Sequence, residues 1–245
     1  MVKIKIKEFS ADCDCWVKNS FFTLLADAIE CAYLANAKEI SNPGSKARFI
    51  RFSILSSALA IECAANACFQ SLAFSSELTE RMERHLRTLD KFEMASIALY
   101  GENRFDRGEL RTQQIQDLIQ LRNDYVHPKI HTQPVVSKND DIKEVTVLCG
   151  QYQFLKLDKS FRAWKDTDPQ TVLQAVDSFL TYFFMDHCQW TPERATEILL
   201  PRLVLDGKPL PQNPHHELDY IQKAEEMWKI TFPFIHRPAL TIKDT

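Results

Sequence analysis

The 245-residue chain contains only five glycines. Turn-rich β-sandwiches use glycine where tight turns need a positive φ, so the shortage of glycine argues against that fold. Neither of the glycine-rich phosphate-binding patterns, GxxxxGK(S/T) and GxGxxG, occurs in the chain. These absences argue against nucleotide hydrolysis and against redox chemistry with a dinucleotide.

The chain also has little excess charge, with a formal net charge of -3 at pH 7. A protein that binds duplex DNA usually carries a basic domain, because it has to neutralise phosphates. The charge balance therefore predicts no duplex DNA partner. Any contact with nucleic acid has to come from a local basic patch.

The seven cysteines are an odd number, scattered through segments of helical character, and do not resemble a disulfide framework. Cys13 and Cys15 lack a second pair at zinc spacing, so we expect no metal site and no cofactor. The N-terminus lacks the apolar run of a signal peptide. The longest apolar segment is interrupted by Glu62 and Asn66, which argues against a membrane span. These features predict a cytoplasmic protein.

Helical periodicity dominates the chain, in residues 20–40, 46–74, 76–100, 109–126 and a segment that begins at Asp168. Alternation of polar and apolar residues predicts strands over 2–9 and 144–157, the second as a hairpin around Gly150. We therefore predict a mainly α protein. Residues 1–190 would form a four- to five-helix up-and-down bundle with this small accessory β-sheet, and residues 191–245 a C-terminal helical extension packed on the core.

An arginine lies on the apolar stripe of the helix predicted over 109–126. At about 100° per residue, Arg122 falls near the centre of this stripe. The other members of the stripe are Ile115, Leu118, Ile119 and Val126. Burying a guanidinium without a counter-charge costs several kcal/mol, so Arg122 needs a partner or has to face a cleft. Glu62 interrupts the apolar helix over 46–74 in a similar way and is the predicted partner.

Two more polar residues lie near Arg122. Asn123 and His127 are four residues apart, one helical turn, on the flank of the same stripe. Pro128 disfavours the α conformation at His127 and should end the helix there. The unpaired carbonyls of a last helical turn favour a protonated imidazole, which suits His127 to proton transfer near neutral pH.

The run RNDYVH, residues 122–127, resembles the signature of HEPN domains, in which an arginine and a polar residue precede a histidine near the end of a late bundle helix. The order of the predicted helices is similar to a HEPN bundle over about residues 18–190. The resemblance does not cover the strands predicted over 144–157 or the last 50 or so residues.

The resemblance implies a metal-independent endoribonuclease of the toxin or phage-defence type, with a composite active site at a homodimer interface. His127 would act as general base or acid, Arg122 would hold the scissile phosphate, and Asn123 would orient one of them. Glu62 would support Arg122. The RNA backbone would contact flanking residues, namely Tyr125, Lys129, Arg111 and Arg107. The implied partners are RNA, a second copy of the chain and an antitoxin protein.

Two other interpretations remain open. In the first, the chain is a non-catalytic HEPN-like module that binds a protein or a nucleotide-like ligand; this predicts that Glu62 occupies Arg122 and that His127 is closed off from solvent. In the second, the protein is unrelated to HEPN domains; this would be favoured if the helices that carry Glu62 and Arg122 were not neighbours.

Overall fold

The fold is known from a computed structural model, which describes residues 15–72, 74–127, 135–137, 145–147, 150–205, 208–211 and 214–237. The protein is mainly helical, as the sequence predicts. A π-helical turn, η1 (Tyr182–His187), continues α6. The α-helices are α1 (Phe21–Asn36), α2 (Pro43–Gln70), α3 (Ser76–Glu83), α4 (Thr88–Tyr100), α5 (Leu110–Val126), α6 (Asp168–Thr181), α7 (Pro192–Leu199) and α8 (His215–Trp228).

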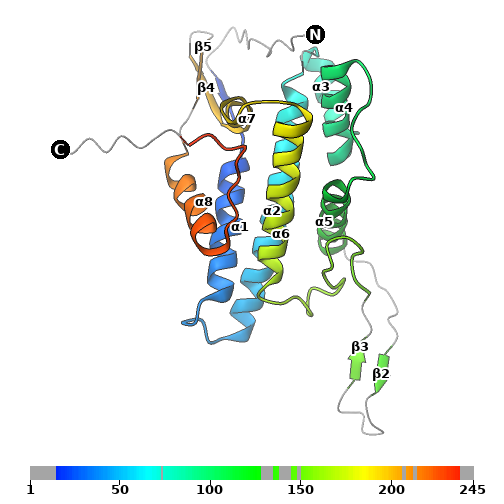
Figure 1. Ribbon diagram of the computed structural model, residues 1–245, viewed down its shortest axis with the longest axis vertical. Coiled ribbons are helices and arrows are strands. Elements are labelled where there is room, and N and C mark those ends of the chain that lie inside the picture. Colours follow the sequence, from blue (N-terminus) through cyan, green and yellow to red (C-terminus); the bar gives the residue numbers. More distant parts are fainter. Residues whose placement is uncertain are drawn as a thin grey trace, which may run out of the picture.

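Helix α2 is the central element. It packs against α1, α4, α5 and α6, and Figure 1 shows α1 on one side of it and α3 to α5 on the other. Its first turn is capped by Asn42, whose side chain accepts a hydrogen bond from the N–H of Gly44 at 2.8 Å. By length and composition alone α2 could cross a membrane, but 61% of its apolar window is buried inside the structure, as in the core helix of a folded bundle.

Small residues let α1 and α2 lie close together. The buried Ser53 donates a hydrogen bond to the carbonyl of Ala28 at 2.7 Å, directly from one helix to the backbone of the other. Ala32 and Ala58 are also buried in this core. Side chains of this size leave room for two backbones to approach, so the α1–α2 hairpin forms the base on which the other helices pack.

An aromatic cluster joins α4 to α6 and η1. The ring of Phe92 lies edge-on to Phe179 at 5.1 Å and to Phe183 at 4.6 Å between centroids. Phe105, in the connection before α5, packs on the same two rings. Edge-to-face packing of this kind is favourable beyond the burial of area, so the cluster fixes α4 against α6.

The segment after residue 191 also packs on the core. Helix α8 lies against α1. The buried Phe234 contacts Phe21 of α1 at 6.3 Å and Phe184 of η1 at 5.6 Å between ring centroids. The last described residues are therefore part of the same hydrophobic core as the bundle.

The structure does not support the accessory sheet that the sequence predicts. Residues 2–9 lie outside the described residues. The prediction of a hairpin around Gly150 is wrong, because β3 (Val145–Val147) pairs with the preceding strand β2 (Val135–Ser137) and not with a strand after Gly150. Residues 152–157 form a turn instead, since the carboxylate of Asp117 accepts hydrogen bonds from the N–H groups of Phe154 and Leu155, at 2.6 and 3.0 Å. These charge-assisted bonds hold the turn against α5.

Strands that the sequence did not predict form a separate antiparallel sheet. Its order is β1 (Cys15–Val17), β4 (Arg202–Leu205) and β5 (Lys208–Pro211). The C-terminal extension is therefore not purely helical, because it contributes β4 and β5 between α7 and α8.

The predicted helix over 76–100 is divided in two. The break falls between Glu83 and Thr88. The second half, α4, ends at Gly101 with φ of 75°, a left-handed conformation that glycine adopts without strain. The helix end predicted there is confirmed.

The aromatic cluster gives a direct test of the core. We expect Phe92→Ala to lower the free energy of unfolding by about 3–5 kcal/mol, because it leaves a cavity between Phe179 and Phe183. Urea denaturation followed by circular dichroism measures this change. Leu110, which is 57% exposed, supplies the control; Leu110→Ala should stay within about 0.5 kcal/mol of the unaltered protein. Equal effects of the two variants would contradict this account of the core.

Candidate functional site

The candidate site lies at the C-terminal end of α5. The helix begins after Glu109, whose carboxylate accepts a hydrogen bond from the N–H of Arg111 at 2.6 Å. It ends at Val126, and the N–H of the following His127 donates to the carbonyl of Asn123 at 2.9 Å. The backbone of His127 has left the helical conformation, with φ of -118° and ψ of 64°. The predicted end of the helix at His127 is confirmed.

The apolar stripe of α5 differs in part from the prediction. Its buried members include Ile115, Leu118 and Leu121. Val126 does not belong to it, because it is 52% exposed. In the last turn Tyr125 packs against the core instead, and a step of about 100° turns Val126 away. Arg122 still lies within the stripe, between the directions of Ile115 and Leu118.

Arg122 pairs with Glu62, as the sequence predicts. Its Nη2 donates a hydrogen bond to Oε2 of Glu62 on α2, and the two side chains are 20% and 37% exposed. Arg122 Nε is buried and has no hydrogen-bond partner among the described residues. Since the pair joins α5 to α2, the two helices are neighbours, which removes the condition that would favour a fold unrelated to HEPN domains.

The Glu62–Arg122 pair belongs to a ladder of polar contacts along α2. Glu62, Asn66 and Gln70 occupy successive turns of this helix. Each contacts a different neighbouring helix. Glu62 contacts Arg122 on α5, Asn66 accepts a hydrogen bond from Lys91 on α4, and Gln70 donates to Glu83 on α3 at 3.3 Å. This polar ladder positions three helices along one face of α2.

Lys91 is a buried member of the polar ladder that the sequence did not reveal. It is 5% exposed, and this burial lowers the pKa of its ammonium group, although Glu83 and Glu62 raise it in part. The sequence does contain one indication of this contact, because Asn66 is a polar residue in the apolar segment of α2, one turn after Glu62. A second polar residue on the same face predicts a second polar partner, but its identity depends on how α4 packs.

Asn123 and His127 are exposed, in contrast to Arg122. Their neighbour Tyr125, predicted to bind the RNA backbone, is half-buried, and its ring lies 5.4 Å from that of Phe161 and 6.3 Å from that of Trp164. Asp124 accepts a hydrogen bond from the hydroxyl of Tyr152 at 2.9 Å. The end of α5 is thus fixed by aromatic packing on one side and leaves His127 open to solvent.

The predicted backbone-binding arginines lie far from His127. Arg111 is at the other end of α5, about 24 Å away along the helix. It pairs with Glu109 at 3.4 Å and lies over the ring of Tyr182 at 5.0 Å. Arg107 forms ion pairs with Glu93 and, at 2.6 Å, with Asp90. The structure therefore does not bring these arginines into the candidate site, and Lys129 lies outside the described residues.

A second histidine, His187, is packed between helices. Its Nε2 lies 2.9 Å from Oγ of the buried Ser96, and its ring stacks on Phe183 at 5.7 Å between centroids. Burial lowers the pKa of the His187 imidazole, and the positive charge of Arg104 lowers it further. A serine with no exposed surface cannot reach a substrate, so this pair is structural.

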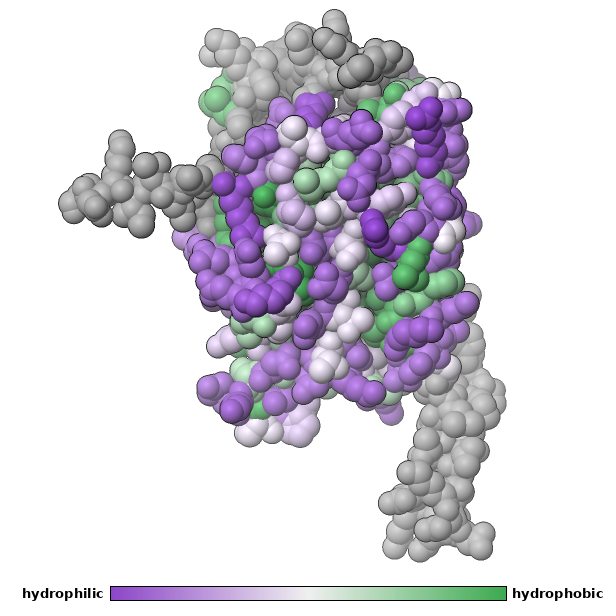
Figure 2. Space-filling model, in the orientation of Figure 1, coloured by the Kyte–Doolittle hydropathy of each residue, from purple (hydrophilic) through white to green (hydrophobic). Residues whose placement is uncertain are grey.

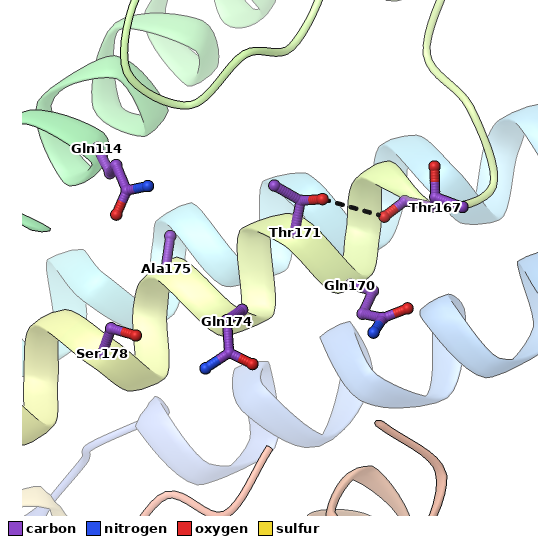
Figure 3. Close-up of a pocket in the computed structure, with 7 residues that line it drawn as sticks. All are labelled: Gln114, Thr167, Gln170, Thr171, Gln174, Ala175 and Ser178. Carbon is purple, nitrogen blue, oxygen red and sulfur yellow. Dashed lines mark hydrogen bonds between the residues drawn. The ribbon is translucent and has the colours of Figure 1, made fainter. Parts of the chain in front are cut away.

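A shallow groove of about 420 Å³ runs over the outer face of α6. Figure 3 shows its lining, which is Gln114 from α5 together with Thr167, Gln170, Thr171, Gln174, Ala175 and Ser178. In Figure 2 the middle of this face is white to pale, between more strongly hydrophilic side chains. The lining has no titratable side chain, so the groove offers no acid or base.

The residues that could bind a metal ion are dispersed. Among the residues that the structure describes, no three His, Cys, Asp or Glu side chains are grouped as a metal site would require. Comparison of the chain with known protein families, with curated proteins and with solved structures found no match.

The Arg122–Glu62 pair should contribute to stability. In a double-mutant cycle with Glu62→Gln and Arg122→Gln, we expect a coupling free energy of about 1–2 kcal/mol, because the pair is half-buried. The control is the exposed pair of Arg84 and Glu80, whose side chains are 73% and 68% exposed. Its coupling should be about 0.3–0.5 kcal/mol. Equal couplings, measured by urea denaturation, would contradict the supporting role of Glu62.

His187 should make stability depend on pH. Because its folded-state pKa is lowered, the unfolded state binds more protons as the pH falls below about 6.5. The stability that neutral His187 contributes is thus complete above about pH 6.5 and decreases below it. We expect the melting temperature to fall less from pH 7.5 to pH 5 in His187→Gln than in the unaltered protein. Parallel curves would contradict this.

Proposed function

We propose that this chain is a HEPN-like, metal-independent endoribonuclease of the toxin or phage-defence type, acting in the cytoplasm as a homodimer. The observation that carries the proposal is the arrangement at the end of α5, where Glu62 positions Arg122 and the following turn presents His127 to solvent. A positioned guanidinium next to an accessible imidazole provides the two groups that cleavage of an RNA phosphodiester requires.

The proposed reaction needs no group beyond the RNA itself as nucleophile. His127 takes the proton from a ribose 2′-hydroxyl, and the 2′-oxygen attacks the adjacent phosphorus. The bond from phosphorus to the 5′-oxygen breaks, and a protonated imidazole donates a proton to that oxygen. The products are a 2′,3′-cyclic phosphate and a 5′-hydroxyl. Arg122 stabilises the negative charge that develops on the phosphate, and Asn123 orients the phosphate or the imidazole.

The geometry of α5 explains why a second copy would be needed. His127 is five positions after Arg122, which places the two residues about 140° apart around the helix. One copy therefore presents the two groups on different sides. A pair of copies that meet at the ends of their α5 helices can combine Arg122 of one copy with His127 of the other, and can supply one imidazole as base and one as acid.

One observation favours a second candidate function, a non-catalytic HEPN-like module that binds a protein or a nucleotide-like ligand. Glu62 already neutralises Arg122, and Arg122 Nε is closed off from solvent. A guanidinium carries five N–H donors, so one bond to Glu62 leaves others for a phosphate. The binding module alone does not require an exposed His127, and this exposure is the observation that supports the enzyme.

RNA cleavage tests the proposal. We expect the purified protein to cleave RNA in the presence of EDTA and to leave a cyclic phosphate terminus. His127→Ala should reduce the rate by at least about 100-fold, the usual contribution of a general acid or base. His216→Ala is the matched control, because His216 is also an exposed histidine near a helix terminus, on α8, and should keep full activity. RNA that stays intact across varied substrates would contradict the enzyme and favour the binding module.

A further inference from the structure

We propose that two copies of this chain pair through the outer face of α2, antiparallel and about a two-fold axis beside Leu55 and Ser56. The inference depends on the proposed function only for the expectation of a dimer. It adds the surface through which the copies meet, which is defined here by Phe52, Leu55 and Leu59 and called the α2 seam.

The α2 seam is an apolar line on a helix face that no other element covers completely. Phe52 is 58% exposed and Leu59 is 40% exposed, and they are two turns apart on one side of the helix. Leu55 lies between them and is half-buried. Single exposed apolar residues are normal on protein surfaces, but a line of large ones on one face is typical of an interaction site.

Two further exposed residues widen the α2 seam. Phe161 is 43% exposed. The guanidinium carbon of Arg51, the residue before Phe52, lies over the Phe161 ring, 5.8 Å from its centroid. Val126 is 52% exposed and lies one turn beyond Arg122, which pairs with Glu62 near Leu59. Both neighbouring segments thus add apolar surface at the edge of the α2 seam, which a single helix would be too narrow to supply.

The charges along α2 identify a second copy as the occupant. The basic residues Arg48 and Arg51 lie before the α2 seam, and the acidic Glu62 lies after it, on the same side of the helix. Glu62 is 37% exposed, so it keeps an open side in addition to its contact with Arg122. In an antiparallel pair, Phe52 of each copy faces Leu59 of the other, and Glu62 lies level with Arg48 and Arg51 of the other. A parallel pair would bring like charges together.

This arrangement also moves the candidate site towards the axis. Arg122 is level with Glu62, and Tyr125 contacts Phe161 at 5.4 Å. Phe161 in turn lies under Arg51, in the N-terminal half of α2. The end of α5 therefore extends from Glu62 back along α2 towards Leu55. Pairing at the α2 seam brings both copies of His127 towards the two-fold axis.

Substitutions in the α2 seam test the inference. Light scattering coupled to size exclusion should show a dimer for the unaltered protein at micromolar concentration. Phe52→Asp and Leu59→Asp should each weaken dimerisation at least 100-fold, with an unchanged helical circular dichroism spectrum because both side chains are exposed. Leu110→Asp, at a leucine that is 57% exposed on α5, should remain a dimer. A monomeric unaltered protein, or a dimer that both α2 variants preserve, would overturn the inference.

A cross-link provides a second test that does not depend on disruption. Ser56→Cys should form a disulfide between two copies under mild oxidation, above the level of the native cysteines, whereas Leu110→Cys should not. Arg51→Glu should weaken the dimer by at least tenfold at low salt, and less at high salt. Absence of the cross-link would overturn the proposed axis. A dimer that responds to these substitutions as expected but leaves RNA intact would support pairing through the α2 seam and contradict only the proposed ribonuclease activity.

Discussion

The ion pair between Arg122 and Glu62 is the contact on which the candidate site depends. It joins the last turns of α5 to the C-terminal half of α2, and it begins the polar ladder that continues through Asn66 and Gln70. Polar contacts inside a bundle are directional, so they select one register of α3, α4 and α5 along α2, which apolar packing alone would define less sharply. The position of His127 follows from this register, because His127 ends the helix that Arg122 holds.

Residues 122–127, at the end of α5, have an inward side and a solvent side that differ in their contacts. On one side, Arg122 and Tyr125 face inward and pack against α2 and against the turn that contains Phe161. On the other, Asn123 and His127 face solvent. A rigid inner side keeps the backbone of the last turn in place without closing off the imidazole. This division suits a site that is half built by each copy of a dimer, since each copy holds its guanidinium firmly and offers its histidine outward.

The features that could be predicted from the sequence are those with local causes. The helix end at His127, the end of the helix predicted over 76–100 and the partner of Arg122 follow from backbone preferences and from the cost of a buried charge. The absence of the hairpin expected over 144–157 could not be predicted, because Asp117, from another part of the chain, accepts hydrogen bonds from the N–H groups of Phe154 and Leu155. Val126 was misplaced for a related reason, since the packing of Tyr125 decides which side of the last turn is buried. The distance of Arg107 and Arg111 from the site could have been predicted, because the helix expected over 109–126 already places Arg111 about 24 Å from His127.

The central claim is that Arg122 and His127 act together only when two copies meet. A crystal structure of the protein in its solution assembly tests this most directly. The account predicts a two-fold dimer in which both copies of residues 122–127 line one cleft, with Arg122 of one copy near His127 of the other. A monomer, or a dimer in which the two copies of residues 122–127 lie on separate surfaces, would contradict it.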